Sequence, residues 1–331
     1  MKNTLANLSR RRVLLALAAS PFAASTPALA SAAYPNRPIR LVVPFPAGGG
    51  VDIFARPLAL GLSDALGVPV VIENVGGAAS RIGTQRVVNA EPDGYTLMVT
   101  NDTLVASDSV SGVAGLARML PQLQPVTMGI SSCNLFVSHP RSGITDPASY
   151  LEQLRARDGG LTIGVPGWGT AHHLCSAALN HRLGVTAEHV SYRGGAPLLA
   201  DVLNGTLNAG VVTMAAAVAH IQAGNLLGLA VTSETRAPAL PDVPTLHESI
   251  APGYTHKTWQ GVFAPAGLPD DLLQRVHAAV VQALQHPKVQ EMLPAQGFDA
   301  EGLPSTAFSA SLEASLKNFE TVVQATGIKA A

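Results

Sequence analysis

The hydrophobic pattern of the chain alternates between two periods. Short apolar runs rich in Val, Ile and Leu predict strands, and longer segments with apolar positions three or four residues apart predict helices. Strands are expected at 39–43, 70–73, 96–100, 126–130, 135–138, 161–165, 189–191, 209–213, 227–232 and 259–264. Helices are expected at 51–66, 82–89, 147–157, 172–182, 197–204, 218–223, 270–284, 287–296 and 306–326. This alternation predicts an α/β protein with parallel or mixed sheets flanked by helices on both faces.

The turn after the first predicted strand is the most informative segment. Strand 39–43 runs directly into Pro46, Ala47, Gly48, Gly49, Gly50 and Asp52, where a helix is expected to begin. Three consecutive glycines leave N–H groups uncovered at the positive end of that helix, which suits an anionic group such as a small carboxylate. The glycines can also serve only to permit a tight turn with positive φ. Both interpretations stay open on this segment alone.

Similar loops follow three other predicted strands. Segment 74–83 follows the second strand, segment 166–173 follows strand 161–165, and segment 192–195 follows strand 189–191. Each is rich in glycine and leads to a helix. Because ligands of open α/β sheets bind beyond the carboxyl ends of the strands, we expect these loops to converge on one cleft.

The first 30 residues have the pattern of an export signal peptide. Lys2 and Arg10 to Arg12 are followed by the mostly apolar segment 13–24, and small residues at 28–30 or 30–32 supply a cleavage site near residue 30 to 33. Segment 9–15 also resembles the twin-arginine pattern, so that route and the ordinary secretory route both stay open. The pattern predicts a periplasmic protein.

The net charge of the chain after the predicted signal bears on the kind of partner that it binds. Residues 1–30 contain four basic and no acidic residues, so the rest has 17 Lys and Arg against 22 Asp and Glu, a formal charge of −5. We therefore expect no nucleic-acid partner, since such partners are bound by basic surfaces.

The chain after the signal has about 300 residues, a length that favours two lobes over one. Cys133 and Cys175 allow one disulfide or two separate buried thiols, and we favour the thiols.

Few sequence features suggest catalysis. His172 and His173 precede Cys175 at a predicted helix start, but adjacent side chains on a helix point about 100° apart and rarely bind one metal ion. No nucleophile elbow, phosphate-binding loop or complete dinucleotide fingerprint occurs. We predict a binding protein with no catalytic residue, metal or cofactor. A secreted hydrolase is a less favoured alternative.

The order of short motifs resembles one known family over nearly the whole chain after the signal. The matching segments are 34–35, 38–45, 52, 71–74, 92–97, 167–170, 173–174, 192–194, 196–197, 220–224, 229–233, 239–245 and 263–267. In this order they resemble the extracytoplasmic solute receptors of tripartite tricarboxylate transporters, the Bug or TctC family.

The resemblance implies a two-lobed fold like that of type II periplasmic binding proteins. Lobe 1 would comprise 34–130 plus 235–331 and lobe 2 would comprise 131–234. The lobes would close around a small organic carboxylate held largely by main-chain amides and hydroxyl groups. Closure would deliver the ligand to membrane permease subunits encoded elsewhere. A periplasmic sensor that docks on a sensor kinase is the alternative.

The expected ligand-binding residues come from the loops at the strand ends. They are Pro46, Ala47, Gly48, Gly49, Gly50, Asp52, Ala79, Ser80, Arg81, Thr100, Trp168, Gly169, Thr170, His173, Tyr192, Arg193, Gly194 and Thr213. His173 matches a residue that the family often has, and we expect it to cap the helix or line the cleft.

Segment 211–214, Arg81 and Trp168 depart from the family pattern, and each bears on the identity of the ligand. Segment 211–214 lacks the acidic residue that could pair with a ligand ammonium, which disfavours an amino acid. We hypothesise that Arg81 pairs with a second carboxylate and that Trp168 stacks on a planar or apolar ligand body. These roles favour a dicarboxylate or an aromatic acid. The alternatives are a solvated surface arginine and a tryptophan that packs on its own lobe. Segment 102–124 lacks the usual pattern, so no contacts are assigned to it.

Overall fold

The structure is a computed structural model that describes residues 34–156 and 161–329. The export signal predicted for residues 1–30 lies outside the described residues. All described helices and strands belong to one compact unit, Arg37–Ala331. Within the described ranges, none of the helices combines the length and hydrophobicity that a membrane-spanning helix requires.

Ten strands form one mixed sheet, as the alternating pattern predicts. Its main path runs β2-β1-β3-β9-β4-β7-β5-β6. In the first part, β1 pairs in parallel with β2 and β3, whereas β9 lies antiparallel to β3 and β4. In the second part, β5 pairs in parallel with β6 and β7, and β8 pairs with β4. The strands are β1 Ile39–Val43, β2 Val70–Asn74, β3 Thr96–Asn101, β4 Leu123–Ser138, β5 Thr162–Val165, β6 Glu188–Ser191, β7 Ala209–Thr213, β8 Leu227–Val231, β9 Lys257–Pro265 and β10 Asp299–Pro304.

The long strand β4 joins the two parts of the sheet. Its residues Leu123 to Cys133 pair with β9, and Asn134 to Ser138 pair with β7. The sequence analysis predicted two strands, 126–130 and 135–138, and this division is wrong. The two serines between them are buried in the continuous strand because they find partners: Ser131 donates to the Glu301 carboxylate at 2.6 Å and Ser132 to the Gly297 carbonyl at 2.8 Å.

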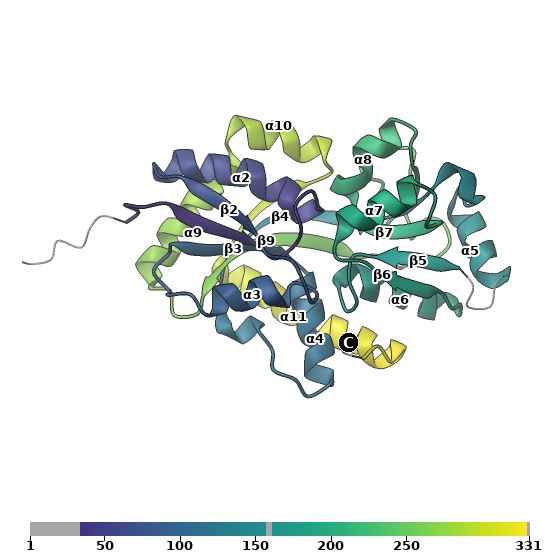
Figure 1. Ribbon diagram of the computed structural model, residues 1–331, viewed down its shortest axis with the longest axis horizontal. Helices are drawn as coiled ribbons and strands as arrows, with labels where there is room; N and C mark the ends of the chain where they lie inside the picture. The colour runs from purple at the N-terminus through teal and green to yellow at the C-terminus, as the bar shows by residue number, and fades with distance from the viewer. Residues whose placement is uncertain (1–33, 157–160, 330–331) are drawn as a thin grey trace, which may run out of the picture. The chain divides into compact units, whose positions relative to one another are not determined.

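Helices cover both faces of each part of the sheet (Figure 1). In the first part, α2 (Gly50–Leu66), α9 (Asp270–Leu284) and α10 (Pro287–Ala295) lie on one face. The other face carries α3 (Arg81–Val88), α4 (Thr103–Val113) and α11 (Ser305–Thr326). In the second part, α5 (Pro147–Ala156) and α6 (Ala171–Leu183) lie on one face, and α7 (Gly195–Leu203) and α8 (Met214–Gln222) on the other. Two short 3₁₀ helices span Leu120–Gln122 and Pro140–Ser142.

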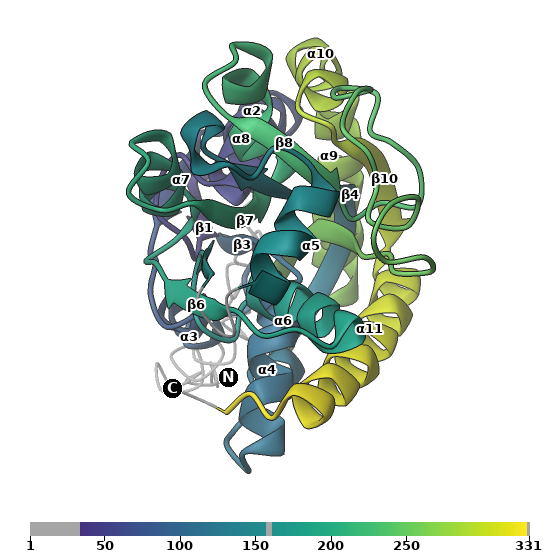
Figure 2. The ribbon, with the colours of Figure 1, turned by 90° about the vertical axis from the view of Figure 1, so that its right-hand side faces the viewer.

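Helix α11 packs against both α4 and α6, as Figure 2 shows, and so contacts elements of both parts of the sheet. Its Phe308 ring is fully buried and lies 5.1 Å from the Trp259 ring and 5.2 Å from the Phe263 ring, centroid to centroid. Aromatic contacts at this spacing add to the stabilisation that burial provides. The last helix of the chain is therefore part of the core.

Cys133 and Cys175 are free, buried thiols, as we favoured from the sequence. Burial is the largest influence on both and raises the pKa of each thiol to about 11. Neither thiol is ionised near neutral pH, so both act as small apolar core residues.

One α-helix and one strand were not predicted. Helix α4 is buried from Thr103 to Ser111, so its polar and apolar residues do not separate into an exposed and a buried face, and no amphipathic period marks it. Strand β10 contains Gly302 and Pro304, which usually indicate a loop. It pairs only with β4, and its register shifts between Ala300 and Leu303, which accommodates these residues at a sheet edge.

The turn between β1 and α2 is held by a buried carboxylate. One oxygen of Asp52 accepts hydrogen bonds from the Gly48 N–H and from Arg56, each at 2.8 Å. The other accepts from the Asn74 amide at the end of β2, at 3.0 Å. Burial by itself would raise the pKa of Asp52, but these hydrogen bonds outweigh it and the pKa is lowered. The ionised form therefore stabilises the turn.

We predict that Asp52→Asn destabilises the fold in a pH-dependent way. Because the pKa is lower in the folded protein than the ordinary aspartate value of about 3.9, the ionised carboxylate stabilises the fold above that value. That contribution is lost as the pH falls through the folded pKa. At pH 7 the variant should lose about 1–3 kcal/mol of unfolding free energy, and the difference should shrink below about pH 4.

Urea unfolding of both proteins between pH 7 and pH 3 measures this difference. The exposed Asp242, replaced by Asn, is the matched control and should change little. A difference that stays constant down to pH 3, or equal stability at pH 7, would contradict the role assigned to the carboxylate.

Candidate functional site

The four glycine-rich loops converge on one cavity, as their positions at strand ends predicted. We call this cavity, of about 360 Å³, the large compartment. Its walls come from the β1–α2 turn, the loop before α3, helix α4 and the loops after β5 and β6. They include Pro46, Ala79, Ser80, Arg81, Ser107, Val110, Ser111, Leu116, Trp168, Gly169, Tyr192, Arg193 and Gly194.

A second cavity of about 30 Å³, the small compartment, adjoins the first, and Phe45, Pro46 and Pro166 line both. Five helices begin at its wall: Gly50 opens α2, Thr103 opens α4, Gly195 opens α7, and Thr170 and Thr213 occupy the N-cap positions of α6 and α8. The first N–H groups of a helix have no intrahelical partner and carry its positive dipole end. The small compartment is therefore suited to a negatively charged group.

The charges around the cleft favour an anion as well. Within residues 34–156 and 161–329, no aspartate or glutamate lines either compartment. The large compartment has two cationic side chains in its wall, Arg81 and Arg193. A ligand ammonium would find no counter-charge there, so the cleft is electrostatically matched to acids rather than to amines.

His172, rather than the predicted His173, lines the small compartment. Its Nε2 lies 3.1 Å from the Thr213 hydroxyl, and its Nδ1 has no partner among the described residues. Burial lowers the pKa of His172 to about 4, so the ring is neutral near pH 7. His173 instead accepts a hydrogen bond from the Gly169 N–H at 3.1 Å and holds the loop before α6. The two neighbours differ because adjacent helical side chains point in different directions.

Trp168 forms a fixed aromatic wall of the large compartment. Its side-chain N–H donates to the Lys329 carbonyl at 3.0 Å, and its ring centroid lies 4.2 Å from that of His173. The His173 ring in turn contacts His189 at 4.8 Å. Trp168 is 39% exposed. It therefore contacts both its own loop and the end of the chain, and it also lines the cavity.

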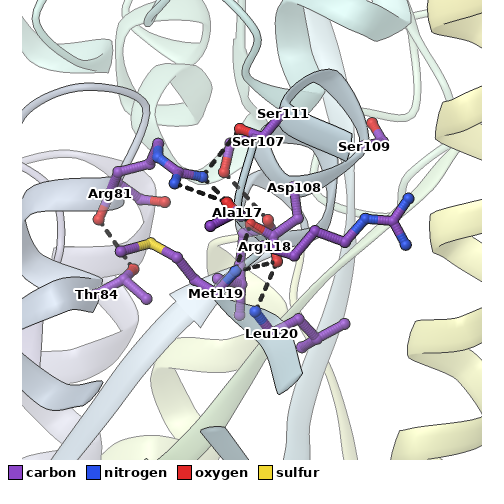
Figure 3. A network of polar contacts seen from close by, with 12 residues as sticks. Arg81, Thr84, Ser107, Asp108, Ser109, Ser111, Ala117, Arg118, Met119 and Leu120 are labelled. Carbon is purple, nitrogen blue, oxygen red and sulfur yellow. Dashed lines mark hydrogen bonds and ion pairs between the residues drawn. The ribbon is translucent and has the colours of Figure 1, made fainter. Parts of the chain in front are cut away.

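Arg81 is held by the protein itself (Figure 3). One of its terminal nitrogens donates to the Ser111 hydroxyl at 3.0 Å and lies 3.4 Å from the Asp108 carboxylate. The other donates to the Ala117 carbonyl at 3.1 Å. These contacts link the start of α3 to α4 and to the segment after it. The alternative of a solvated surface arginine is therefore wrong.

The buried Asp108 carboxylate is the centre of this network (Figure 3). It accepts hydrogen bonds from the main-chain N–H groups of Met119 and Leu120, at 2.6–3.0 Å. Burial raises the pKa of Asp108, while these hydrogen bonds and the charges of Arg81 and Arg118 act against it. The carboxylate thus fixes both α4 and Arg81 as parts of the cavity wall.

The loop before α3 has an unusual backbone. Ala78, Ala79 and Ser80 have φ angles of 47°, 47° and 73°. Residues with a Cβ pay a steric cost in this left-handed region, of about 1–2 kcal/mol each. The surrounding contacts must overcome that cost, and such strain is concentrated at ligand sites in many proteins.

The predicted site residues divide into three groups. Those that line the large compartment are Pro46, Ala79, Ser80, Arg81, Trp168, Gly169, Tyr192, Arg193 and Gly194. Those that line the small compartment are Pro46, Gly49, Gly50, Thr170 and Thr213. Neither wall includes Ala47, Gly48, Asp52, Thr100 or His173. The Gly48 N–H and the Asp52 carboxylate bind each other, and Thr100 is buried inside β3.

Several lining residues were missed by the sequence analysis. Ser107, Val110 and Ser111 belong to α4, which was not predicted, and Leu116 follows it. Asn101 and Thr103 line the small compartment at the end of β3. The rule that ligands lie beyond strand ends could have indicated the last two. No pattern in segment 102–124 indicates that α4 faces the cleft.

Two relatives are similar to this chain over most of its length. A UPF0065 protein encoded in the tcbD–tcbE intergenic region of Pseudomonas sp. (strain P51) is 35% identical over 299 residues, covering 90% of this chain and 89% of the relative. Protein BugT of Bordetella pertussis is 33% identical over 265 residues, covering 80% of this chain and 81% of BugT.

Solved structures share the fold. The periplasmic binding protein BugD superimposes with a TM-score of 0.84 at 29% identity, covering 89% of this chain and 99% of BugD. R. palustris Rpa4515 with adipate gives the same TM-score, identity and coverage. MatC from Rhodopseudomonas palustris with bound malate gives a TM-score of 0.82 at 27% identity, covering 88% of this chain and all of MatC. The predicted two-lobed binding-protein fold is confirmed.

A sequence profile of the tripartite tricarboxylate transporter family receptors, TctC, matches residues 54–328. This match confirms the resemblance found in the order of the motifs. The chain belongs to the TctC family of tripartite tricarboxylate transporter receptors, which includes the Bug proteins.

Proposed function

We propose that this protein is a periplasmic solute-binding protein that captures a small organic carboxylate between two lobes and delivers it to a tripartite tricarboxylate-type permease. The observation that carries the proposal is the small compartment, where five helices begin and no described acidic side chain lies in the wall. A carboxylate oxygen placed there accepts hydrogen bonds from N–H groups that the helices leave unpaired.

The division into lobes follows from the same proposal. We take lobe 1 as 34–130 plus 235–331 and lobe 2 as 131–234, so that β4 and the segment after β8 connect the two. The close approach of Gly50 in α2 to Thr213 before α8 supports a closed arrangement. A Cβ atom on Gly50 would lie 2.7 Å from the Thr213 Cβ. Opening about the connecting strands would separate these residues and admit the ligand.

Localisation and partners are inferred from the family and the sequence. The signal predicted at residues 1–30 would export the chain to the periplasm, where a TctC receptor meets its permease. We assign no catalytic residue, because the site is explained by hydrogen-bond donors and charge. The solved relatives with adipate and malate support an organic acid as the ligand.

We predict that organic acids stabilise the protein and that the matching neutral amides do not. A thermal-shift screen should include adipate, succinate, malate and benzoate, with adipamide and benzamide as neutral controls of similar shape. A ligand at a hundred times its Kd should add about 2.7 kcal/mol to the free energy of unfolding. Equal effects of acids and amides, or no effect of any organic acid in a broad panel, would contradict the proposal.

A second prediction uses the close approach of Gly50 to Thr213. Gly50→Ala should weaken carboxylate binding, by about tenfold for a cost of about 1.4 kcal/mol on closure, because the new Cβ lies within 2.9 Å of three Thr213 side-chain atoms. Gly49→Ala is the comparison variant: Gly49 also lines the small compartment, so a methyl group added there tests the effect of filling the wall without a contact to Thr213. The Gly49 φ of −79° suits alanine, and its Cβ would meet no atom closer than the Pro46 carbonyl at 3.6 Å.

Isothermal titration of both variants with the best acid from the screen provides the measurement. Unfolding by urea shows whether each variant keeps its stability. If Gly50→Ala binds as tightly as the wild type, these residues do not come together in the ligand-bound state.

A further inference from the structure

We propose that Arg193 binds a second anionic group of the ligand and so makes the site selective for dicarboxylates over monocarboxylates of the same length. The inference rests on the proposed function, in which the small compartment holds the first carboxylate. It assigns to Arg193 the role that the sequence analysis gave to Arg81.

The two compartments differ in the kind of positive charge that they offer. No arginine or lysine lines the small compartment within the described residues, so its potential comes from helix ends. The large compartment adjoins it along Phe45, Pro46 and Pro166 and contains both cationic side chains. A ligand anchored by one carboxylate in the small compartment therefore extends along these apolar residues toward the arginines.

Arg81 is poorly suited to take the second charge. Its guanidinium is 3.4 Å from the buried Asp108 carboxylate, so the pair is electrically balanced. Hydrogen bonds to Asp108, Ser111 and Ala117 occupy three of its five N–H donors. Its main function is to hold α4 and α3 together as a wall of the cavity.

Arg193 is in the opposite situation. Among residues 34–156 and 161–329 it has no hydrogen-bond or ion-pair partner, and it lines the large compartment with an exposed side chain. All five donors of its guanidinium are therefore available for a carboxylate, which can accept two of them side by side.

The backbone on both sides of Arg193 is fixed. The Tyr192 N–H donates to the Val165 carbonyl at 2.9 Å, and the Gly194 N–H donates to the Pro166 carbonyl at 3.0 Å. The Tyr192 hydroxyl also donates to Asp201 at 2.7 Å. Only the side chain of Arg193 has to become ordered when a ligand binds, which limits the entropic cost.

The surface between the two anion sites is uncharged and partly aromatic. Phe45, Pro46 and Trp168 line the large compartment, and the Trp168 ring is held by Lys329 and His173. Such a surface suits a methylene chain or a ring as the spacer between the two carboxylates. The class of ligand that fits all three features is a dicarboxylate with a short apolar body.

The experiment compares acids that differ in one charge. Adipate is paired with hexanoate, succinate with butanoate, and 1,4-benzenedicarboxylate with 4-methylbenzoate. Titration calorimetry measures the Kd of each acid for the wild type, Arg193→Gln and Arg193→Lys. Arg155→Gln removes an exposed arginine from α5 and is the charge-matched control.

We expect the wild type to bind the dianion of at least one pair about tenfold more tightly than the monoanion. Arg193→Gln should weaken binding of the dianion by at least tenfold more than binding of its monoanion partner, so that the preference disappears. Arg193→Lys should keep part of the preference, and Arg155→Gln should keep all of it. The affinity of the wild type for the dianion should also fall more steeply with salt than that of Arg193→Gln.

Other outcomes overturn the inference. It fails if the wild type shows no preference for dianions, or if Arg193→Gln weakens both members of a pair equally or neither. In these cases monocarboxylate binding still supports the proposed function. If no acid binds to the wild type, the proposed function fails and the inference with it. A preference lost in Arg81→Gln but kept in Arg193→Gln would assign the second anion to Arg81.

Discussion

The site depends on the continuous pairing of one strand, β4, with β9 in the first part of the sheet and β7 in the second. β4 pairs first with β9, with two register shifts, and then with β7, so it determines how the β1–α2 turn faces the starts of α6, α7 and α8. Both parts of the sheet contribute residues to the wall of the small compartment. Its lining joins Gly50 in the first part to Thr170, Gly195 and Thr213 in the second.

Helix ends offer a different kind of anion site from a buried ion pair. A buried arginine or lysine must be desolvated, and this cost can exceed the attraction that it provides. The N–H groups at helix starts are already fixed and carry only partial charges, so their cost is met when the protein folds. The neutral state of His172 is consistent with this design, because burial lowers its pKa to about 4. In the proposed function, ligand selection then depends on the large compartment, whose wall contains Arg81 and Arg193.

The sequence predicted the fold class, nearly all the strands and the four loops of the cleft, because those features are local. A strand, a glycine turn and a helix start lie within a few consecutive residues, as at 39–66. The features that were missed depend on distant partners. The serines of β4 are buried because Glu301 and Gly297 bind them, and α4 is buried on all sides by elements far away in the chain. No local pattern records such contacts.

The two arginines of the cleft illustrate the same limit for function. In the sequence, Arg81 and Arg193 both lie in glycine-containing loops after strands, and either could bind a carboxylate. The two arginines differ because Asp108 pairs with Arg81. Asp108 lies 27 positions after Arg81 in the chain and belongs to no recognisable motif. A cation that is paired with a buried carboxylate helps to form the wall of the cavity but adds little net charge to it. A cation without such a partner makes the electrostatic potential of the cavity more positive. The electrostatic role of each residue is thus set by the tertiary structure rather than by its loop.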